Sequence, residues 1–212
     1  MVLEVVDIAL LLVVIKAIDN RRLIMKKLVL VGLVSALLVG CTSASKMTKV
    51  NSNVKGLVYN SVASNYTPML TTVSLLDFDD GSQALNYRSE TYKRDNYGNI
   101  QTVNVTIPNT SLEQHLELLN KFIDWDIKAK ARAEQFDKEI GRAKTTNGYS
   151  VYTFHSGSKY SNFLDICFVI SEGSPCMIES ITFDVQNVKN IIQDLTKFKS
   201  GGFKHVDTSV YQ

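Results

Sequence analysis

The three histidines are the side chains best suited to acid–base chemistry near neutral pH, and their surroundings predict no catalytic site. His155 lies beside serines in the run Phe154 to Ser158, but no carboxylate that would orient its imidazole can be assigned. His115 falls on the inner side of a predicted helix, and His205 lies in the C-terminal tail. The sequence has no HExxH, CxxC, GxSxG, GxGxxG or P-loop pattern. We therefore predict no catalytic residue, no metal site and no cofactor.

Aromatic and cationic side chains gather around one predicted hairpin turn. They are Tyr92, Lys93, Arg94 and Tyr97. Two cations and two tyrosines could bind an acidic partner surface, or could bind a glycan by stacking. The alternative is a solvated hairpin tip with no binding role.

The N-terminal part of the chain has the order of a secretory signal. From Met25 it reads MKKLVLVGLVSALLVGCTS, which is two lysines, an apolar run over residues 28–39, and then small residues. This is the tripartite pattern of a signal peptide. The apolar run is shorter than the roughly 20 residues that span a bilayer, which favours a signal peptide over a permanent transmembrane anchor.

The end of this segment, Leu38-Val39-Gly40-Cys41, resembles the lipobox of bacterial lipoprotein precursors. The resemblance covers residues 25–41 only. It implies cleavage between Gly40 and Cys41, followed by acylation of Cys41 on its sulfur and on its new amino group. Several acyl chains, each worth about 0.8 kcal/mol per buried CH₂, form a stable membrane anchor. The alternative is an ordinary signal sequence that ends in a buried cysteine.

The resemblance also implies a location. In Gram-negative lipoproteins the residue after the lipidated cysteine sorts the protein, and an aspartate there favours the inner membrane. Thr42 stands at that position, which implies the inner leaflet of the outer membrane, facing the periplasm, if the host is Gram-negative. Residues 1–40 are therefore expected to be the signal peptide. Within them, residues 1–24 favour a start codon assigned too early, with an unusually long n-region as the alternative.

The charge balance excludes a strongly basic binding protein. The 212 residues include 23 Lys and Arg and 21 Asp and Glu, for a net charge of +2. Five of the basic and three of the acidic residues lie in residues 1–40, which leaves 18 of each sign in residues 41–212. A neutral mature chain argues against nucleic acid as a partner. We expect it to contact the membrane through its lipid anchor.

Two cysteines remain if Cys41 is acylated, namely Cys167 and Cys176. An even pair in an oxidising envelope compartment favours a disulfide. The pair flanks a predicted turn at residues 171–175, and disulfide geometry is demanding. A turn centred on Gly173 places the cysteines out of register, whereas a slightly earlier centre aligns them. Two small buried side chains are the alternative.

Residues 41–56 (CTSASKMTKVNSNVKG) are mostly Ser, Thr, Asn and Lys, and they predict a flexible tether between the lipid and the folded domain. The domain is expected over residues 57–212, with a short edge strand within 57–66. Two stretches of this domain are similar to each other. Residues 73–122 and 149–198, aligned without a gap, share nine of fifty positions, where chance gives roughly three.

Each of the two stretches predicts three strands followed by a helix. The predicted strands are 69–78, 83–93 and 99–107 in the first, and 149–156, 161–171 and 176–184 in the second, which ends in a helix near 186–199. We therefore predict an α+β two-layer sandwich. Its antiparallel sheet would come from a tandem βββα duplication, over about 69–144 and 149–199, with the helices on one face. The alternative is two similar β-meanders that arise from composition.

The first helix is predicted to run from Thr110 to about Lys144, because apolar residues recur three or four positions apart. A helix of ~35 residues would be ~52 Å long and would extend beyond the sheet. Its apolar stripe includes Trp125, Phe136 and Ile140. We expect these three side chains to form a surface for another envelope protein or for a second copy of the chain. The alternative is a helix that crosses the domain's own sheet.

These features predict a lipid-anchored cell-envelope protein with a non-enzymatic binding or assembly role. Binding would use the long helix or an exposed sheet face. Two alternatives stay open. An envelope hydrolase would gather His155, a carboxylate and a serine in a pocket formed only by the fold. A periplasmic carrier of apolar ligands would have an enclosed cavity lined by aromatic side chains.

Overall fold

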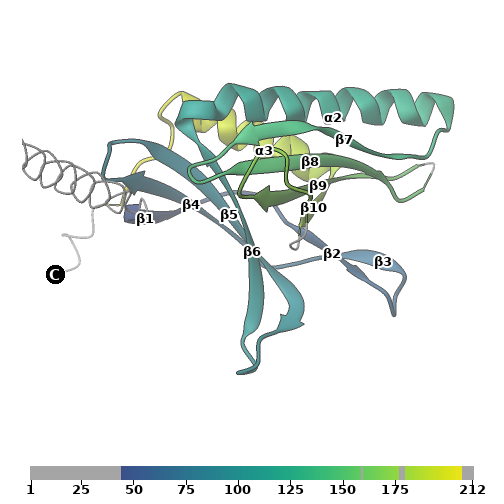
Figure 1. Ribbon diagram of the computed structural model, residues 1–212, viewed down its shortest axis with the longest axis horizontal. Helices are drawn as coiled ribbons and strands as arrows, with labels where there is room; N and C mark the ends of the chain where they lie inside the picture. Colours follow the sequence, from purple (N-terminus) through teal and green to yellow (C-terminus); the bar gives the residue numbers. More distant parts are fainter. Residues whose placement is uncertain (1–43, 159, 177–179, 207–212) are drawn as a thin grey trace, which may run out of the picture. The chain divides into compact units, whose positions relative to one another are not determined.

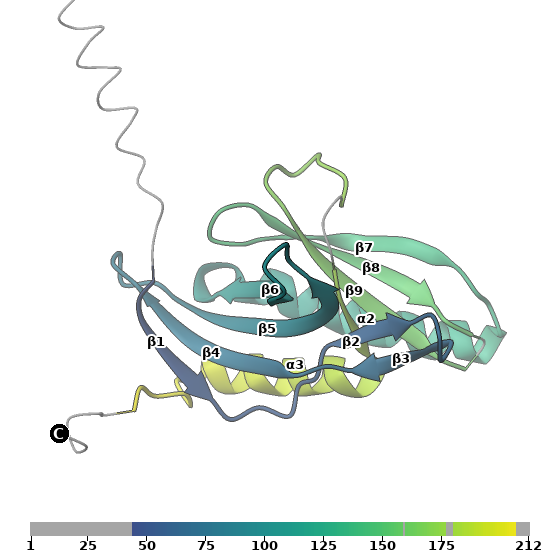
Figure 2. The same cartoon turned by 90° about the horizontal axis from the view of Figure 1, so that it is seen from below.

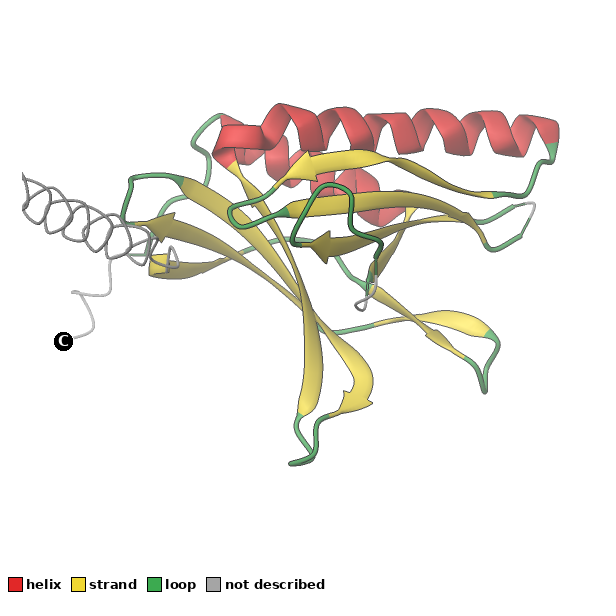
Figure 3. Ribbon diagram, viewed as in Figure 1, coloured by secondary structure: helices red, strands yellow, loops and turns green. Residues whose placement is uncertain are grey.

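The structure is a computed structural model that describes residues 44–158, 160–176 and 180–206. These residues belong to one compact unit of the chain. They form an α+β fold with two antiparallel sheets and two α-helices (Figures 1 and 3). The α+β class is therefore confirmed, but the strands form two sheets where we predicted one.

The first sheet has four strands in the order β1-β4-β5-β6. Their bounds are Ala44–Val50 (β1), Thr71–Phe78 (β4), Gln83–Arg94 (β5) and Ile100–Pro108 (β6). Gly81 and Gly98 lie in the two hairpin turns with φ of +81° and +84°, a conformation that glycine adopts at little cost. In β5, Leu85, Tyr87, Ser89 and Thr91 are buried and the residues between them are not, as expected for a sheet with one covered face.

The second sheet has six strands in the order β3-β2-β10-β9-β8-β7. Their bounds are Asn65–Pro68 (β3), Leu57–Asn60 (β2), Ile181–Asp184 (β10), Asn162–Val169 (β9), Tyr149–Ser156 (β8) and Asp137–Lys144 (β7). The β2–β3 hairpin projects from this sheet on the side away from the helices (Figures 1 and 2). The far end of the β5–β6 hairpin projects from the four-stranded sheet on the same side.

Both helices lie on the same side of the sheets (Figure 1). A 3₁₀ turn, Asn109–Ser111, leads into α2 (Leu112–Arg132), and β10 leads into α3 (Val185–Lys199). The side chain of Asp184 caps α3 by accepting a 2.8 Å hydrogen bond from the Asn187 backbone N–H. α2 packs against α3 and β7, and α3 packs against β9 and β10.

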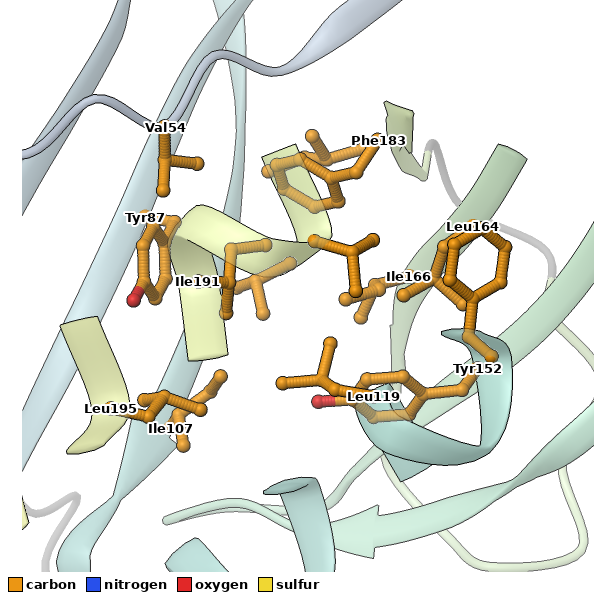
Figure 4. Packing of buried hydrophobic residues seen from close by; sticks show 14 of the residues in the cluster. Val54, Tyr87, Ile107, Leu119, Tyr152, Leu164, Ile166, Phe183, Ile191 and Leu195 are labelled. Carbon is orange, nitrogen blue, oxygen red and sulfur yellow. The ribbon is translucent and has the colours of Figure 1, made fainter. Parts of the chain in front are cut away.

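One hydrophobic core joins both sheets and both helices. Figure 4 shows Ile191 of α3 between Tyr87 of the four-stranded sheet and Ile166 of the six-stranded sheet. Leu119 of α2 lies beside Tyr152 of β8 in the same view. Each such apolar side chain contributes about 1.5–3 kcal/mol when fully buried. Side chains of both helices therefore help to hold the two sheets together.

The prediction of one long helix up to Lys144 is wrong. α2 ends at Arg132, and Ala133 follows in the left-handed conformation with φ of 53°. The chain then forms β7, which pairs with β8. The spacing of four residues between Phe136 and Ile140 misled the prediction, because it places two side chains on one face of a helix and equally on one face of a strand. With 21 residues, α2 is ~31 Å long.

The prediction of a flexible tether over residues 41–56 is also wrong for the residues that the structure describes. β1 pairs with β4 from Ala44 to Val50. The segment after β1 is fastened to α3, because Ser52 donates a 2.5 Å hydrogen bond to Asp194 and Val54 is buried in the core. Polar composition misled the prediction, since an edge strand is held by backbone hydrogen bonds and needs few apolar side chains.

The six strands predicted in the two similar stretches correspond to β4, β5 and β6 and to β8, β9 and β10. Each set of three lies consecutively in one sheet and precedes a helix, α2 or α3. A short strand lies within residues 57–66, as expected, but it is not at the edge of the sheet: β2 lies between β10 and β3, and β3 is the edge strand. β1, β2, β3 and β7 stand outside the predicted three-strand pattern.

Candidate binding groove

A groove opens between the two projecting hairpins that Figure 1 shows. β2 and β3 line one wall and the C-terminal end of β5 lines the other, while β9 and β10 supply the floor. The volume of the groove is about 480 Å³. Binding sites for small molecules generally lie in the range of about 300–1,000 Å³.

Tyrosines form the two walls of this groove. Tyr59 of β2 and Tyr92 of β5 stand on opposite sides and are 53% and 51% exposed. Tyr66 is the cross-strand partner of Tyr59, and the two rings meet edge to face with 5.4 Å between centroids. Beneath them, Tyr66 packs on Phe163 with 4.1 Å between ring centroids. This contact holds the Tyr66 ring in place in the absence of a ligand.

The floor of the groove carries a carboxyl group. Asp165 lies in the middle of β9 on the face turned away from the core, opposite Thr182 of β10. The Thr182 hydroxyl donates a short hydrogen bond to Asp165 Oδ1. Thr91 and Ser180 add two further hydroxyl groups to the lining. The groove therefore contains a carboxyl group and hydroxyl groups that can take part in hydrogen bonds.

Burial raises the pKa of two side chains that line the groove, Asp165 and Tyr66. Partial removal from water raises the pKa of Asp165, and the hydrogen bond from Thr182 opposes that rise. Burial also raises the pKa of Tyr66 to about 12, with a further contribution from the negative charge of Asp165. A carboxyl with a raised pKa in a cleft marks a candidate functional site.

The structure divides the predicted Tyr92–Tyr97 patch. Tyr92 and Lys93 line the groove. Arg94 instead donates a 2.6 Å hydrogen bond from Nη1 to the Gly98 carbonyl oxygen within the hairpin turn. Tyr97 is 91% exposed and is not part of the groove lining. The patch is divided because Tyr97 lies in the turn beyond the end of β5, and Arg94 is held to that turn by its hydrogen bond.

The structure places the predicted helical partner surface against the protein's own sheet. Ile140 is buried in the core, which corrects its assignment to a partner surface. Phe136 stacks on Phe154 of β8 with 4.7 Å between ring centroids, and Trp125 meets both rings at 6.0 Å. The Lys121 and Lys138 ammonium groups lie 5.4 Å and 5.6 Å from the Trp125 ring. These side chains close one end of the core.

The histidines lie in three separate environments. His115 is fully buried, and its Nε2–H donates to the Lys144 carbonyl oxygen at 2.7 Å, so its Nδ1 accepts from the Tyr152 hydroxyl at 2.5 Å. Burial lowers the pKa of His115 to about 4. His155 contacts Asp137 at 2.7 Å, and His205 contacts Asp77 at 2.6 Å. His115 is thus a core residue, as its position in the predicted helix indicated.

The structure contains a disulfide between Cys167 and Cys176, with 6.2 Å between their Cα atoms. Cys167 lies opposite Val151 in the sheet, on the same face as Asp165. Cys176 precedes β10, which begins only at Ile181. The bond therefore joins β9 to an irregular loop, and the register that limited a disulfide across a regular hairpin does not apply.

The residues that carry the lipoprotein resemblance, Gly40, Cys41 and Thr42, lie outside the described residues, as do residues 1–40 as a whole. Among the residues that the structure describes, neither helix is long and apolar enough to cross a bilayer. Comparisons with protein-family models, curated proteins and solved structures found no match to this chain. The groove and the N-terminal sequence pattern are the two features that bear on function.

Sequence reasoning missed the floor and one wall of the groove. One available signal was Asp165, a carboxylate in the middle of the otherwise apolar strand NFLDICFV. The alternation of that strand places Asp165 on the face opposite Leu164 and Ile166. Tyr59, Tyr66 and Asp165 are far apart in the sequence, and no local pattern connects them.

Proposed function

We propose that this protein is a lipid-anchored cell-envelope protein that binds a ligand through the groove between β5 and the β2–β3 hairpin. The groove carries this proposal. Half-exposed tyrosines above a partly buried carboxyl add little to the core, and such an arrangement is typical of a binding site. The lipobox resemblance at Cys41 supports the anchor, and Thr42 supports the inner leaflet of an outer membrane.

Binding is favoured over hydrolysis by the surroundings of His155. Its imidazole contacts Asp137, but the neighbouring Ser156 hydroxyl donates to Asn162 at 3.1 Å. The arrangement of histidine, carboxylate and serine that we expected of a hydrolase is thus not formed by these three residues. An apolar carrier is disfavoured because the groove is open to solvent and Asp165 lies in its floor.

The same proposal includes the origin of the fold. We infer that β4–β5–β6–α2 and β8–β9–β10–α3 come from a tandem duplication of a βββα unit, arranged as a layer of helices over a layer of strands. The shared order of elements and the nine identities in fifty positions support it. In this interpretation, β2 and β3 are additions that supply one wall of the groove.

The anchor is tested by the mass of the protein made in a bacterial host. The full chain is expressed, the membrane fraction is extracted, and the intact mass is measured before and after reduction. We expect a protein that begins at Cys41 and carries acyl chains, with a gain of about 2 Da on reduction of Cys167–Cys176. The Cys41→Ser variant is the control and should lack the acyl chains. A full-length, unlipidated product of the natural sequence would contradict the anchor.

Occupancy of the groove is tested by hydroxyl-radical footprinting of the full chain in isolated envelopes and after purification. Tyr59 and Tyr92 should be protected in the envelope and should react after purification. Tyr97 is the matched control, because it lies on the same hairpin as Tyr92 but outside the groove, and it should react equally in both samples. Equal reactivity of all three tyrosines in both samples would contradict binding at the groove.

A further inference from the structure

The described residues that line the groove carry one charge of each sign. Ten described residues form the lining, and the charged ones among them are Asp165 and Lys93. One acidic and one basic side chain among the described lining residues leave no surplus of either sign that would select a polyanion or a polycation. The lining therefore suits a ligand without net charge.

The walls present flat aromatic faces at fixed positions. Tyr66 is held by its contacts with Phe163 and Tyr59, and the backbone pairing of β2 with β3 holds Tyr59 opposite it. Tyr92 approaches from the other wall. Tyrosine combines a rigid apolar ring with a polar hydroxyl, and few torsions are frozen when it binds. Such rings suit a ligand with an apolar face and a polar rim.

The floor suits a ligand that carries hydroxyl groups. The Asp165 carboxylate accepts one hydrogen bond from Thr182, and an ionised carboxylate has about four acceptor positions. Hydrogen bonds to a charged acceptor are stronger than those between neutral groups. The Ser180 hydroxyl can both donate and accept, whereas the Thr91 hydroxyl already donates to the Gln101 carbonyl oxygen and accepts from the Lys93 backbone N–H. A purely apolar ligand would cover the Asp165 carboxylate without supplying a hydrogen bond to its remaining acceptor positions, and that penalty disfavours it.

We infer that the groove binds a neutral saccharide, whose C–H faces stack on Tyr59 and Tyr92 and whose hydroxyl groups donate to Asp165. A pyranose ring has an apolar C–H face and a rim of hydroxyl groups, which is the combination that the walls and the floor require. This inference rests on the proposed binding function of the groove, and it adds the chemical class of the ligand.

The test uses the full lipidated protein in a detergent without a sugar headgroup. Cellobiose, maltose and N,N′-diacetylchitobiose are titrated separately by calorimetry, with a uronic-acid disaccharide as the charged comparison. We expect at least one neutral disaccharide to bind and the charged one to bind more weakly. Asp165→Asn should weaken binding by about tenfold or more, because it removes a charged acceptor. Tyr92→Ala should weaken it by about two- to tenfold.

Tyr97→Ala is the matched control, because it removes the same side chain from the same hairpin outside the groove, and it should change affinity less than about twofold. Thermal unfolding of each variant shows whether it is folded. If no neutral disaccharide binds at about 10 mM while the footprint shows protection, the saccharide class is wrong and the binding function stands. Binding that Asp165→Asn and Tyr92→Ala leave unchanged would place the sugar elsewhere and overturn the inference. A footprint without protection, together with no sugar binding, would overturn both proposals.

Discussion

The two faces of β8 and β9 contact similar polar and aromatic side chains, which are buried and hydrogen-bonded on one face and partly exposed on the other. On the inner face, Tyr152 and His115 are fully buried and hydrogen-bond to each other, and the second His115 nitrogen is satisfied by a backbone carbonyl. On the outer face, Tyr66 and Asp165 are only partly withdrawn from water, and Asp165 accepts a hydrogen bond from one hydroxyl. The inner polar groups are satisfied within the chain, whereas the outer ones keep capacity for a ligand.

The comparison shows why aromatic content alone did not locate the site. Trp125 and Phe136 look like an exposed stripe in the sequence, yet they pack on Phe154 at the end of the core. Tyr59 and Tyr92 alternate with polar residues like any strand tyrosine, yet they flank the groove. What separates the two groups is the presence of a helix above one face of the sheet and its absence, among the described elements, above the groove.

Replacing an inner-face aromatic should have the largest effect on stability. Phe154→Ala removes a fully buried ring that contacts Phe122, Trp125 and Phe136, and we expect a loss of about 3–5 kcal/mol in the free energy of unfolding. Chemical denaturation measures it, and Phe154→Leu serves if the alanine variant does not fold. Tyr59→Ala, on the other face, should cost less than about 1 kcal/mol. If Tyr59→Ala lost as much free energy of unfolding as Phe154→Ala, Tyr59 would be a structural residue and not a binding residue.

Acid should destabilise the inner face through His115. Its pKa is about 4 in the folded protein and 6.5 when unperturbed, so unfolding favours proton uptake. Its contribution to stability is therefore fully present above pH 6.5 and is lost as the pH falls towards 4. The difference of 2.5 units corresponds to about 3 kcal/mol. Denaturation curves at several pH values measure it. The loss should be smaller in His115→Gln and unchanged in His155→Gln, and an identical loss in His115→Gln would contradict the assignment.

The outer face should depend on its disulfide. Cys167 and Cys176 are nine residues apart, and closing a loop of that length is worth about 2–3 kcal/mol by constraining the unfolded chain. The double variant Cys167→Ala, Cys176→Ala should lose that amount in chemical denaturation. The unaltered protein with a reductant is the control and should lose the same amount. No change in either sample would mean that the loop is held by other contacts, such as the 2.8 Å hydrogen bond from Arg142 to Ser174.

Asp165→Asn should have the smallest effect on stability, and with the opposite sign. The amide keeps an oxygen for the Thr182 hydroxyl but has no charge to withdraw from water, so we expect a gain of up to about 1 kcal/mol, or about 2–4 °C in Tm. Thermal unfolding measures it. Asp137→Asn, where the carboxylate is exposed, should stay within about 0.5 kcal/mol of the natural protein. A clear loss in Asp165→Asn would make Asp165 a structural residue.

The sequence allowed the central strands and both helix starts to be predicted. In β5, Leu85 and Tyr87 alternate with Asn86 and Arg88, which is the period of a strand and not of a helix. β1 and β7 could not be predicted, since Lys46, Thr48 and Lys49 show no apolar face and the spacing of Phe136 and Ile140 fits two kinds of element. Of the groove, the sequence indicated Tyr92 and Lys93. Apart from Thr91, the rest comes from four other strands and from Ser180 just before β10, and only the fold brings these residues together.

With the anchor proposed at Cys41, β1 would set how far the groove can stand from the membrane. An anchor at Cys41 would be separated from Ala44, the first residue of the strand, by three peptide units that reach at most about 10 Å. Ala44 lies opposite Phe78, near the beginning of β5, and Tyr92 lies nine residues further along β5 from Gln83, or about 30 Å. The four-stranded sheet would then separate the groove from the lipid anchor along the length of β5.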